Sequence, residues 1–117
     1  MAEITREHLE LAALAAGKTI LYWADAGRPV VNEDRNGVRG QFLWRPHLDD
    51  GDAARLAVRL GIAVQPLVSY ESVTAWRGPI VARAKHNGTE RDELLAWREA
   101  VVLCAAAVGE RMRNGGA

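Results

Sequence analysis

The segment TERDELLAWREAVVLCAAAVGERM, residues 89–112, decides the fold because it predicts one long amphipathic helix. Thr89 and Asp92 have the spacing of a capping box at a helix start. The apolar face that follows comprises Leu94, Trp97, Val101, Cys104, Ala105, Val108 and Met112. A helix of about 22 residues is about 33 Å long at 1.5 Å per residue. We expect it to lie across a whole sheet and to contribute much of the core.

Two earlier segments predict shorter helices, each followed by a glycine and a strand. Residues 4–17, ITREHLELAALAAG, have a helix cap at Thr5, and residues 18–24, KTILYWA, are rich in β-branched and aromatic side chains. A second helix is predicted to begin at Asp49 or Asp50 and to end before the next glycine, because its apolar residues recur at helical spacing.

The other segments predict strands and turns. Residues 62–70 begin with an apolar extended run, and residues 72–86 read as a hairpin. Residues 25–40 are open to two interpretations, a mobile loop or a hairpin, because they contain the turn signal Asn36-Gly37 ahead of the strand at 41–44. The chain is therefore predicted to be a single α+β domain over residues 1–117, with order αβ(β)αββα. We expect a sandwich in which helices pack on an antiparallel or mixed sheet, with a frayed tail at 113–117.

Composition limits the function classes. The 117 residues suit one domain, and 15 basic and 15 acidic residues cancel to a net charge of zero. Nucleic-acid binders usually carry a basic excess, so composition argues against that partner. The single cysteine, Cys104, excludes an internal disulfide. The absence of a signal segment or a long apolar run predicts a cytoplasmic protein without a membrane partner.

Asp49, Asp50 and Asp52 lie within four positions at the start of the second predicted helix. An aspartate there caps a free backbone N–H, and its neighbours favour the positive end of the helix. A calcium loop spreads its ligands over twelve positions, which this cluster does not do. We therefore interpret all three, together with Thr89 of the last helix, as structural capping residues, with a metal or polar-ligand role as the alternative.

Tryptophans and arginines supply the candidate binding residues. Trp23, Trp44 and Trp76 lie in or at the ends of predicted strands, and Arg45 and Arg77 follow two of them. Core packing is the plain interpretation of the rings. The alternatives are a platform on which a base or nucleotide stacks, and a protein interface anchored by Trp and Arg.

No pattern of catalytic residues is evident. His8, His47 and His86 lack metal-ligand spacing, and Ser72 and Cys104 have no base at motif spacing. The glycines form neither a phosphate loop nor a dinucleotide motif. The sequence therefore predicts no enzyme, no metal and no cofactor.

Residues 44–56 follow the pattern W-x-P-x-x-D-x-x-D-A-x-x-L. This segment resembles the central motif of small phage and prophage proteins described as the phage ABA sandwich domain, related to the NinX-like proteins. Residues 11–23 and 96–110 resemble the family's opening and closing elements. Family members often carry Asn at the position of Arg45, so a role of that Asn does not transfer. The resemblance implies helices on both sides of a sheet and supplies no catalytic residues.

Two functions follow as expectations. The first is a non-enzymatic phage accessory protein that binds a host or phage protein, with a homo-oligomer as one arrangement. It expects an exposed patch around Trp44, Trp76 and their arginines. The second is a protein that sequesters a nucleotide signal of host antiphage defence. It expects a concave pocket lined by Trp and Arg, in which Arg45 and Arg77 hold the nucleotide.

Overall fold

The computed structural model describes residues 4–67 and 71–115, and these form an α+β domain, as predicted. In chain order the elements are α1 (Arg6–Ala15), β1 (Ile20–Ala24), the 3-10 turn η1 (Asp25–Gly27), β2 (Arg28–Arg35), β3 (Val38–Leu43), α2 (Asp50–Leu60), β4 (Ala63–Leu67), β5 (Ser72–Arg77), β6 (Ile80–Lys85) and α3 (Glu90–Arg113). The strands form two antiparallel sheets of three strands each, in the orders β1-β2-β3 and β4-β5-β6. We call them the first sheet and the second sheet.

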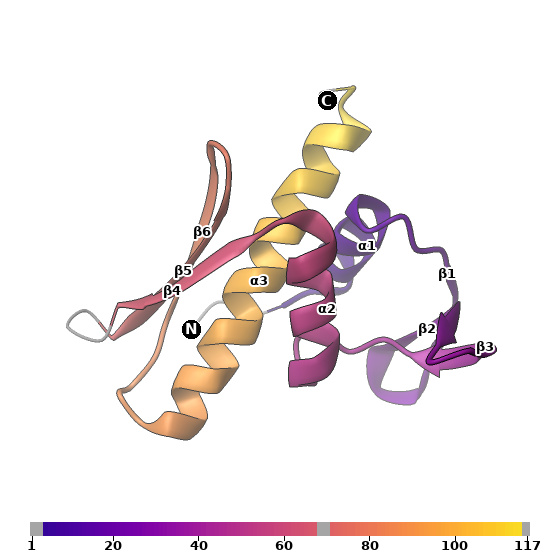
Figure 1. Ribbon diagram of the computed structural model, residues 1–117, viewed down its shortest axis with the longest axis horizontal. Coiled ribbons are helices and arrows are strands. Elements are labelled where there is room, and N and C mark those ends of the chain that lie inside the picture. The colour runs from indigo at the N-terminus through magenta and orange to yellow at the C-terminus, as the bar shows by residue number, and fades with distance from the viewer. Residues whose placement is uncertain (1–3, 68–70, 116–117) are drawn as a thin grey trace.

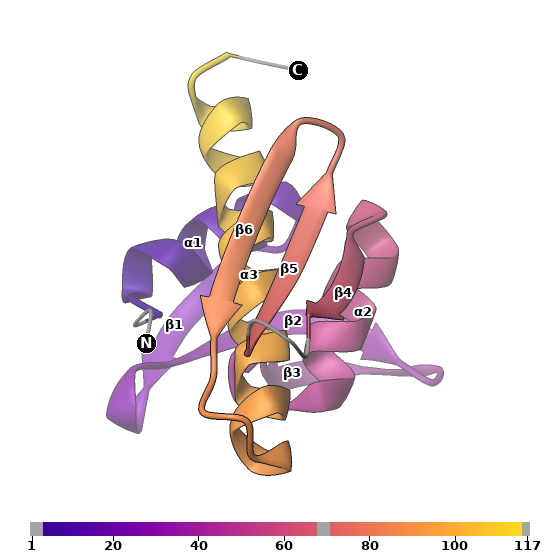
Figure 2. The same cartoon turned by 90° about the vertical axis from the view of Figure 1, so that its left-hand side faces the viewer.

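The elements are stacked in four layers along the molecule (Figure 1). The second sheet packs on one side of α3, and α1 and α2 pack on the other side. The first sheet lies beyond α1 and α2, and Figure 2 shows the second sheet in front with α3 behind it. The strands thus enclose the helices from both ends, whereas the family resemblance implied helices on both sides of one sheet.

α3 is buried on two sides because it separates the second sheet from α1 and α2. Its buried hydrophobic residues are Ala96, Ala100, Val101, Val102, Cys104, Ala105, Ala106 and Val108. The predicted apolar face omitted the buried residues Ala96, Ala100, Val102 and Ala106. It also extended too far at both ends, since Leu94 and Met112 are each 45% exposed. At Gly109 the helix meets α1 so closely that an added Cβ would lie 1.9 Å from the Leu11 carbonyl oxygen. Small residues along α3 therefore set the distance between the helical layers.

The first sheet settles the two interpretations of residues 25–40 in favour of a hairpin. Asn36 and Gly37 have φ values of 53° and 83°, and both strands pair in register up to Arg35 and Val38. Two positive φ values at the centre of a two-residue loop are the requirement of a type I′ turn, which Asn-Gly satisfies. The Asp34 carboxylate also accepts a hydrogen bond of 2.9 Å from the Gly37 N–H.

The second sheet has one buried face and one open face. Val73, Ala75 and Ala84 point into the core toward α3. Pro66 lies in β4, an edge strand, as its missing N–H predicts. The predicted tight turn between β5 and β6 is present, with Gly78 at φ 58°.

Candidate functional site

The helix starts show which of the predicted capping residues act as caps. Asp49 is the N-cap of α2, where its carboxylate accepts a hydrogen bond of 3.1 Å from the Gly51 N–H. Thr89 caps α3 by accepting a bond of 3.3 Å from the Asp92 N–H. The Asp92 carboxylate reaches past Thr89 and accepts from the Asn87 N–H at 2.8 Å, so the predicted box is formed with a shifted partner.

Asp52 has a different role from the other two aspartates of the cluster. It is 2% exposed, and its carboxylate lies 2.6 Å from Arg55 Nη2 and 3.3 Å from Arg35 Nη2. It also accepts a hydrogen bond of 2.9 Å from the Arg45 N–H. Capping explains Asp49 and the position of Asp50 in the first turn, but Asp52 is the buried anchor of an ion-pair chain that joins α2 to the first sheet.

The ion-pair chain continues through the first sheet to the end of α1. Arg35 Nε donates to Glu33 Oε2 at 2.5 Å, and Lys18 donates to the other oxygen of Glu33. Burial alone would raise the pKa of Glu33, but the hydrogen bonds and charges of Lys18 and Arg35 outweigh burial and hold that pKa below its usual value. Glu33 is therefore charged at neutral pH, and acidic and basic side chains alternate along the chain of ion pairs from Lys18 to Arg55.

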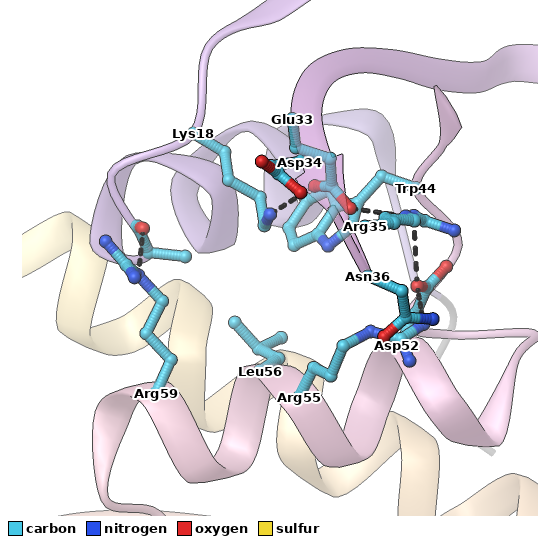
Figure 3. Close-up of a pocket in the computed structure, with 11 residues that line it drawn as sticks. Lys18, Glu33, Asp34, Arg35, Asn36, Trp44, Asp52, Arg55, Leu56 and Arg59 are labelled. Carbon is cyan, nitrogen blue, oxygen red and sulfur yellow. Dashed lines mark hydrogen bonds and ion pairs between the residues drawn. The ribbon is translucent and has the colours of Figure 1, made fainter. Parts of the chain in front are cut away.

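These charged residues line a cavity of about 670 Å³ between the first sheet, α2 and the end of α1. We call it the charged pocket. In Figure 3, Arg55, Leu56 and Arg59 extend from α2 on one side, and Lys18, Glu33 and Arg35 lie on the other. Trp44 and Leu56, each only 2% exposed, are its apolar lining residues. Ligand sites typically combine such a mainly preformed hollow with a few placed polar groups.

Arg59 is the arginine of the charged pocket that remains available for a ligand. Its Nε donates to the Ala16 carbonyl oxygen at 2.5 Å, which fixes the side chain across the gap between α2 and α1. Within residues 4–67 and 71–115 its guanidinium forms no ion pair with a carboxylate. An anchored guanidinium without a counter-ion is a suitable donor for an incoming anion.

A second hollow of about 450 Å³ shares Lys18, Glu33 and Arg59 with the charged pocket and adds Arg39. The two hollows thus form one trough along the hairpin. Its charged lining residues are Lys18, Arg35, Arg39, Arg55 and Arg59 against Glu33, Asp34 and Asp52. The basic side chains outnumber the acidic ones by two, so the trough favours a ligand that carries negative charge.

The structure does not bring the predicted tryptophans and arginines together. Trp44 follows the end of β3 and is buried, and Trp76 lies in β5 of the second sheet. Arg77 turns away from Trp76, and its Nε donates to the Leu60 carbonyl oxygen at 2.9 Å. Trp23 is covered by the Arg6 guanidinium at 4.4 Å from the ring centre, an interaction within the chain. The expected single patch of Trp and Arg is therefore absent from the described residues, and Trp44 belongs to the core.

Sequence reasoning missed the basic residues of the charged pocket. Arg55 and Arg59 are four apart on α2 and so share one helix face, which is a readable signal. Glu33 and Arg35 are two apart on β2 and so share one sheet face. No local sequence pattern links these two pairs, because they come together only when the β2–β3 hairpin packs against α2.

Three titratable groups outside the pocket are shifted by their surroundings. Burial, followed by the charges of Arg98 and Arg45, lowers the pKa of His47. Burial raises the pKa of the Cys104 thiol, as expected for an inert buried cysteine. Burial also raises the pKa of Glu99, which is 5% exposed. Over the described ranges, no three His, Cys, Asp or Glu side chains gather as metal ligands.

In the part of the chain that the structure describes, no helix is both long enough and apolar enough to span a membrane. Comparison of the chain with protein-family models, with curated protein sequences and with solved structures finds no match.

Proposed function

We propose that this protein is a non-enzymatic binding protein that holds a small anionic ligand of the nucleotide class in the charged pocket. The observation that carries the proposal is Arg59, whose guanidinium is anchored through Nε and has no carboxylate partner among the described residues. A phosphate group is the anion best suited to such a planar donor, because two of its oxygens accept parallel N–H bonds.

The acidic residues of the pocket favour a nucleotide over a bare phosphate. Asp34 is exposed and lines both hollows, and one of its oxygens already accepts from Gly37. Carboxylates accept hydrogen bonds from amino groups of the kind found on bases. A ligand with a phosphate at Arg59 and an amino group near Asp34 matches both signs of charge in the trough.

The size of the pocket also suits this class of ligand. Its volume of about 670 Å³ falls within the usual range for small-molecule sites. The adjoining hollow of about 450 Å³ extends the space past Arg59 toward Arg39. The trough therefore offers Arg39 as a second basic residue for a ligand with two phosphate groups.

The biological setting that we propose is a bacteriophage or prophage accessory protein acting in the cytoplasm of the bacterial host. Its support is the resemblance of residues 44–56 to the phage ABA sandwich motif. In that setting, a protein that binds a nucleotide without chemistry would sequester a signal of antiphage defence. The other function, capture of a host or phage protein by a Trp and Arg patch, is less favoured because Trp44 is 2% exposed.

Thermal unfolding in the presence of AMP, ADP and cyclic di-AMP tests the proposal. A ligand at 100 times its Kd stabilises the folded state by about 2.7 kcal/mol. We expect at least one of these nucleotides to raise the Tm of the wild-type protein, and inorganic phosphate to raise it less. Arg59→Gln should abolish the ligand-induced shift, because it removes the anchored guanidinium.

Arg77→Ala is the matched control, because Arg77 also donates to a backbone carbonyl but lies away from the pocket. Each variant is compared with itself, with and without nucleotide, so a lower starting Tm does not affect the result. An equal nucleotide shift in wild type and Arg59→Gln would contradict the proposed site. A native mass spectrum of gently purified protein would then report the subunit number and any retained small molecule.

A further inference from the structure

The outer face of the second sheet is a separate surface that the charged pocket does not involve. Val73, Ala75 and Ala84 face α3, so the alternating residues of β5 and β6 face away from it. These outward residues are Ser72, Thr74, Trp76, Val81, Arg83 and Lys85, of which Ser72 and Thr74 are buried, with 2% and 9% of their surface exposed. Figure 2 shows the second sheet in front of the molecule, with no described element covering it.

This outer face is basic although the whole chain is neutral. The basic residues of this face are Arg83 and Lys85, and residues 62–85 contain Glu71 as the one acidic residue. Glu71 precedes β5, and its carboxylate lies close to Gly88, where an added Cβ would be 3.2 Å from Oε1. In the described residues Arg83 and Lys85 form no ion pair, so their charges are available to a partner.

A hollow of about 460 Å³ marks the basic end of this face. Ser72, Arg83 and Lys85 line it, together with Leu67 of β4. Ser72 lies directly opposite Lys85 in the register, and Arg83 donates to the Thr74 hydroxyl at 3.2 Å. The hydrogen bond holds Arg83 against the sheet, so two cations lie at one place above the buried Ser72, with no carboxylate among the described lining residues.

Trp76 lies at the other end of the same face. Its cross-strand neighbours are Ala63 and Val81, which are short, and Val81 is 59% exposed. Arg83 is the diagonal neighbour of Trp76, and such neighbours are about 7–8 Å apart. An aromatic ring and a cation at this separation can hold a base and the phosphate beside it.

We propose that the outer face of the second sheet binds single-stranded nucleic acid, with phosphates on Arg83 and Lys85 and a base stacked on Trp76. A single strand fits better than a duplex, because only an unpaired base exposes its ring to a side chain. An acidic polypeptide would use the two cations but would have no need of the aromatic ring. The zero net charge argued against this partner, but net charge does not report how charges are distributed over a surface.

Fluorescence anisotropy with labelled dT12 and U12 at 50 mM and 200 mM NaCl tests this proposal. We expect both strands to bind at low salt and a hairpin duplex of equal length to bind more weakly. Two phosphate contacts predict a slope of log K against log salt of about −1.4, since each contact in a single strand contributes about −0.7. Arg83→Ala and Lys85→Ala should each make the slope less steep by about 0.7.

Trp76→Ala should weaken binding about 5- to 150-fold, the usual effect of removing one stacked base contact, and Trp76→Phe should retain most of the affinity. Arg111→Ala is the matched control, because Arg111 is an exposed arginine in the last turn of α3. If Trp76→Ala does not fold, binding by Arg83→Ala, Lys85→Ala and Trp76→Phe still tests the proposal. Absence of binding at 50 mM NaCl would overturn the proposal. So would competition by polyglutamate together with no effect of Trp76→Ala, which would identify a surface for acidic polypeptides.

Discussion

The two sheets of this protein use charge in opposite ways. In the first sheet, Glu33 and Arg35 alternate with their partners Lys18 and Asp52, so that both Lys18 and Arg35 have an anion beside them. In the second sheet, Arg83 and Lys85 share a face on which no carboxylate lies among the described residues. A neutral chain thus contains one charge-paired region and one basic region. The comparison teaches that the placement of acids relative to bases, and not their totals, determines which partners a surface favours.

The charged residues of the first sheet stabilise the fold, whereas those of the second sheet are open to a binding partner. The ion-pair chain of the first sheet ties the hairpin to α2 and α1, in addition to the apolar packing of Val31 in the core. The second sheet is held by its apolar face on α3, and among the described residues its outer cations Arg83 and Lys85 form no ion pair. We expect substitutions in the first region to lower stability and those on the outer face of the second to alter binding alone.

Gly109→Ala should have the largest effect, because it acts on the helical layer that carries both sheets. The added Cβ would lie 1.9 Å from the backbone oxygen of Leu11, and backbone cannot move aside as a side chain can. We expect a loss of about 3 kcal/mol in the free energy of unfolding, measured with urea. Gly40→Ala in β3 is the control, because its Cβ would meet only Phe42 at 3.9 Å. Equal effects of the two would mean that α1 and α3 are not closely packed.

Asp52→Asn should have the next effect, and it should loosen the first sheet selectively. The carboxylate is 2% exposed and faces two arginines, so its loss leaves Arg55 without a carboxylate partner and Arg35 with Glu33 alone. We expect a cost of about 2–3 kcal/mol, less than for a fully buried pair because Arg55 is largely exposed. Asp50→Asn, whose side chain is 62% exposed beside Arg98, should cost about 0.5 kcal/mol or less. Hydrogen exchange should rise in β2 and β3 of Asp52→Asn and stay unchanged in β5.

Glu33→Gln should give a pH-dependent loss. The folded state holds the pKa of Glu33 below its ordinary value of 4.5, so the unfolded state takes up the proton first as the pH falls. The stabilisation is therefore complete above pH 4.5 and disappears as the pH falls through the folded pKa. We expect the variant to be about 1 kcal/mol less stable at pH 7 and equal to wild type in strong acid. A difference that persists in acid would show that packing, and not charge, is responsible.

Lys18→Ala and Lys85→Ala should show the smallest and most telling difference. Lys18 is paired with Glu33, and Lys85 is on the unpaired outer face. We expect Lys18→Ala to cost about 0.5–1 kcal/mol and Lys85→Ala to stay within about 0.5 kcal/mol of wild type. In thermal unfolding, high salt should reduce the stability loss of Lys18→Ala and leave that of Lys85→Ala unchanged. A larger loss of stability for Lys85→Ala than for Lys18→Ala would contradict the proposed difference between the two sheets.

The sequence was sufficient for the local elements and insufficient for their arrangement. The caps Asp49 and Thr89 and the Asn36-Gly37 turn are set by neighbours in the chain, so their patterns could be read directly. The division into two sheets could not be read, because strand patterns carry no information about which non-adjacent strands pair.

The candidate site was hidden for the same reason. Asp52 resembles its neighbours in sequence, and only the packing of the hairpin on α2 gives it two arginine partners. The Trp-Arg dipeptides were conspicuous, but adjacent strand residues face opposite ways, so Trp76 and Arg77 were separated by the fold. The spacing of Arg55 and Arg59 on α2, and of Glu33 and Arg35 on β2, was the better indication of the site.

The most direct test of the central claim, that the charged pocket is the small-ligand site, is a two-dimensional ¹H–¹⁵N NMR titration. AMP, ADP and cyclic di-AMP are each added to the wild-type protein. At least one of them should shift the amide signals of residues 33–36 and 52–59 and leave those of residues 73–84 in place. No shift with any of the three, or shifts confined to the second sheet, would contradict the account.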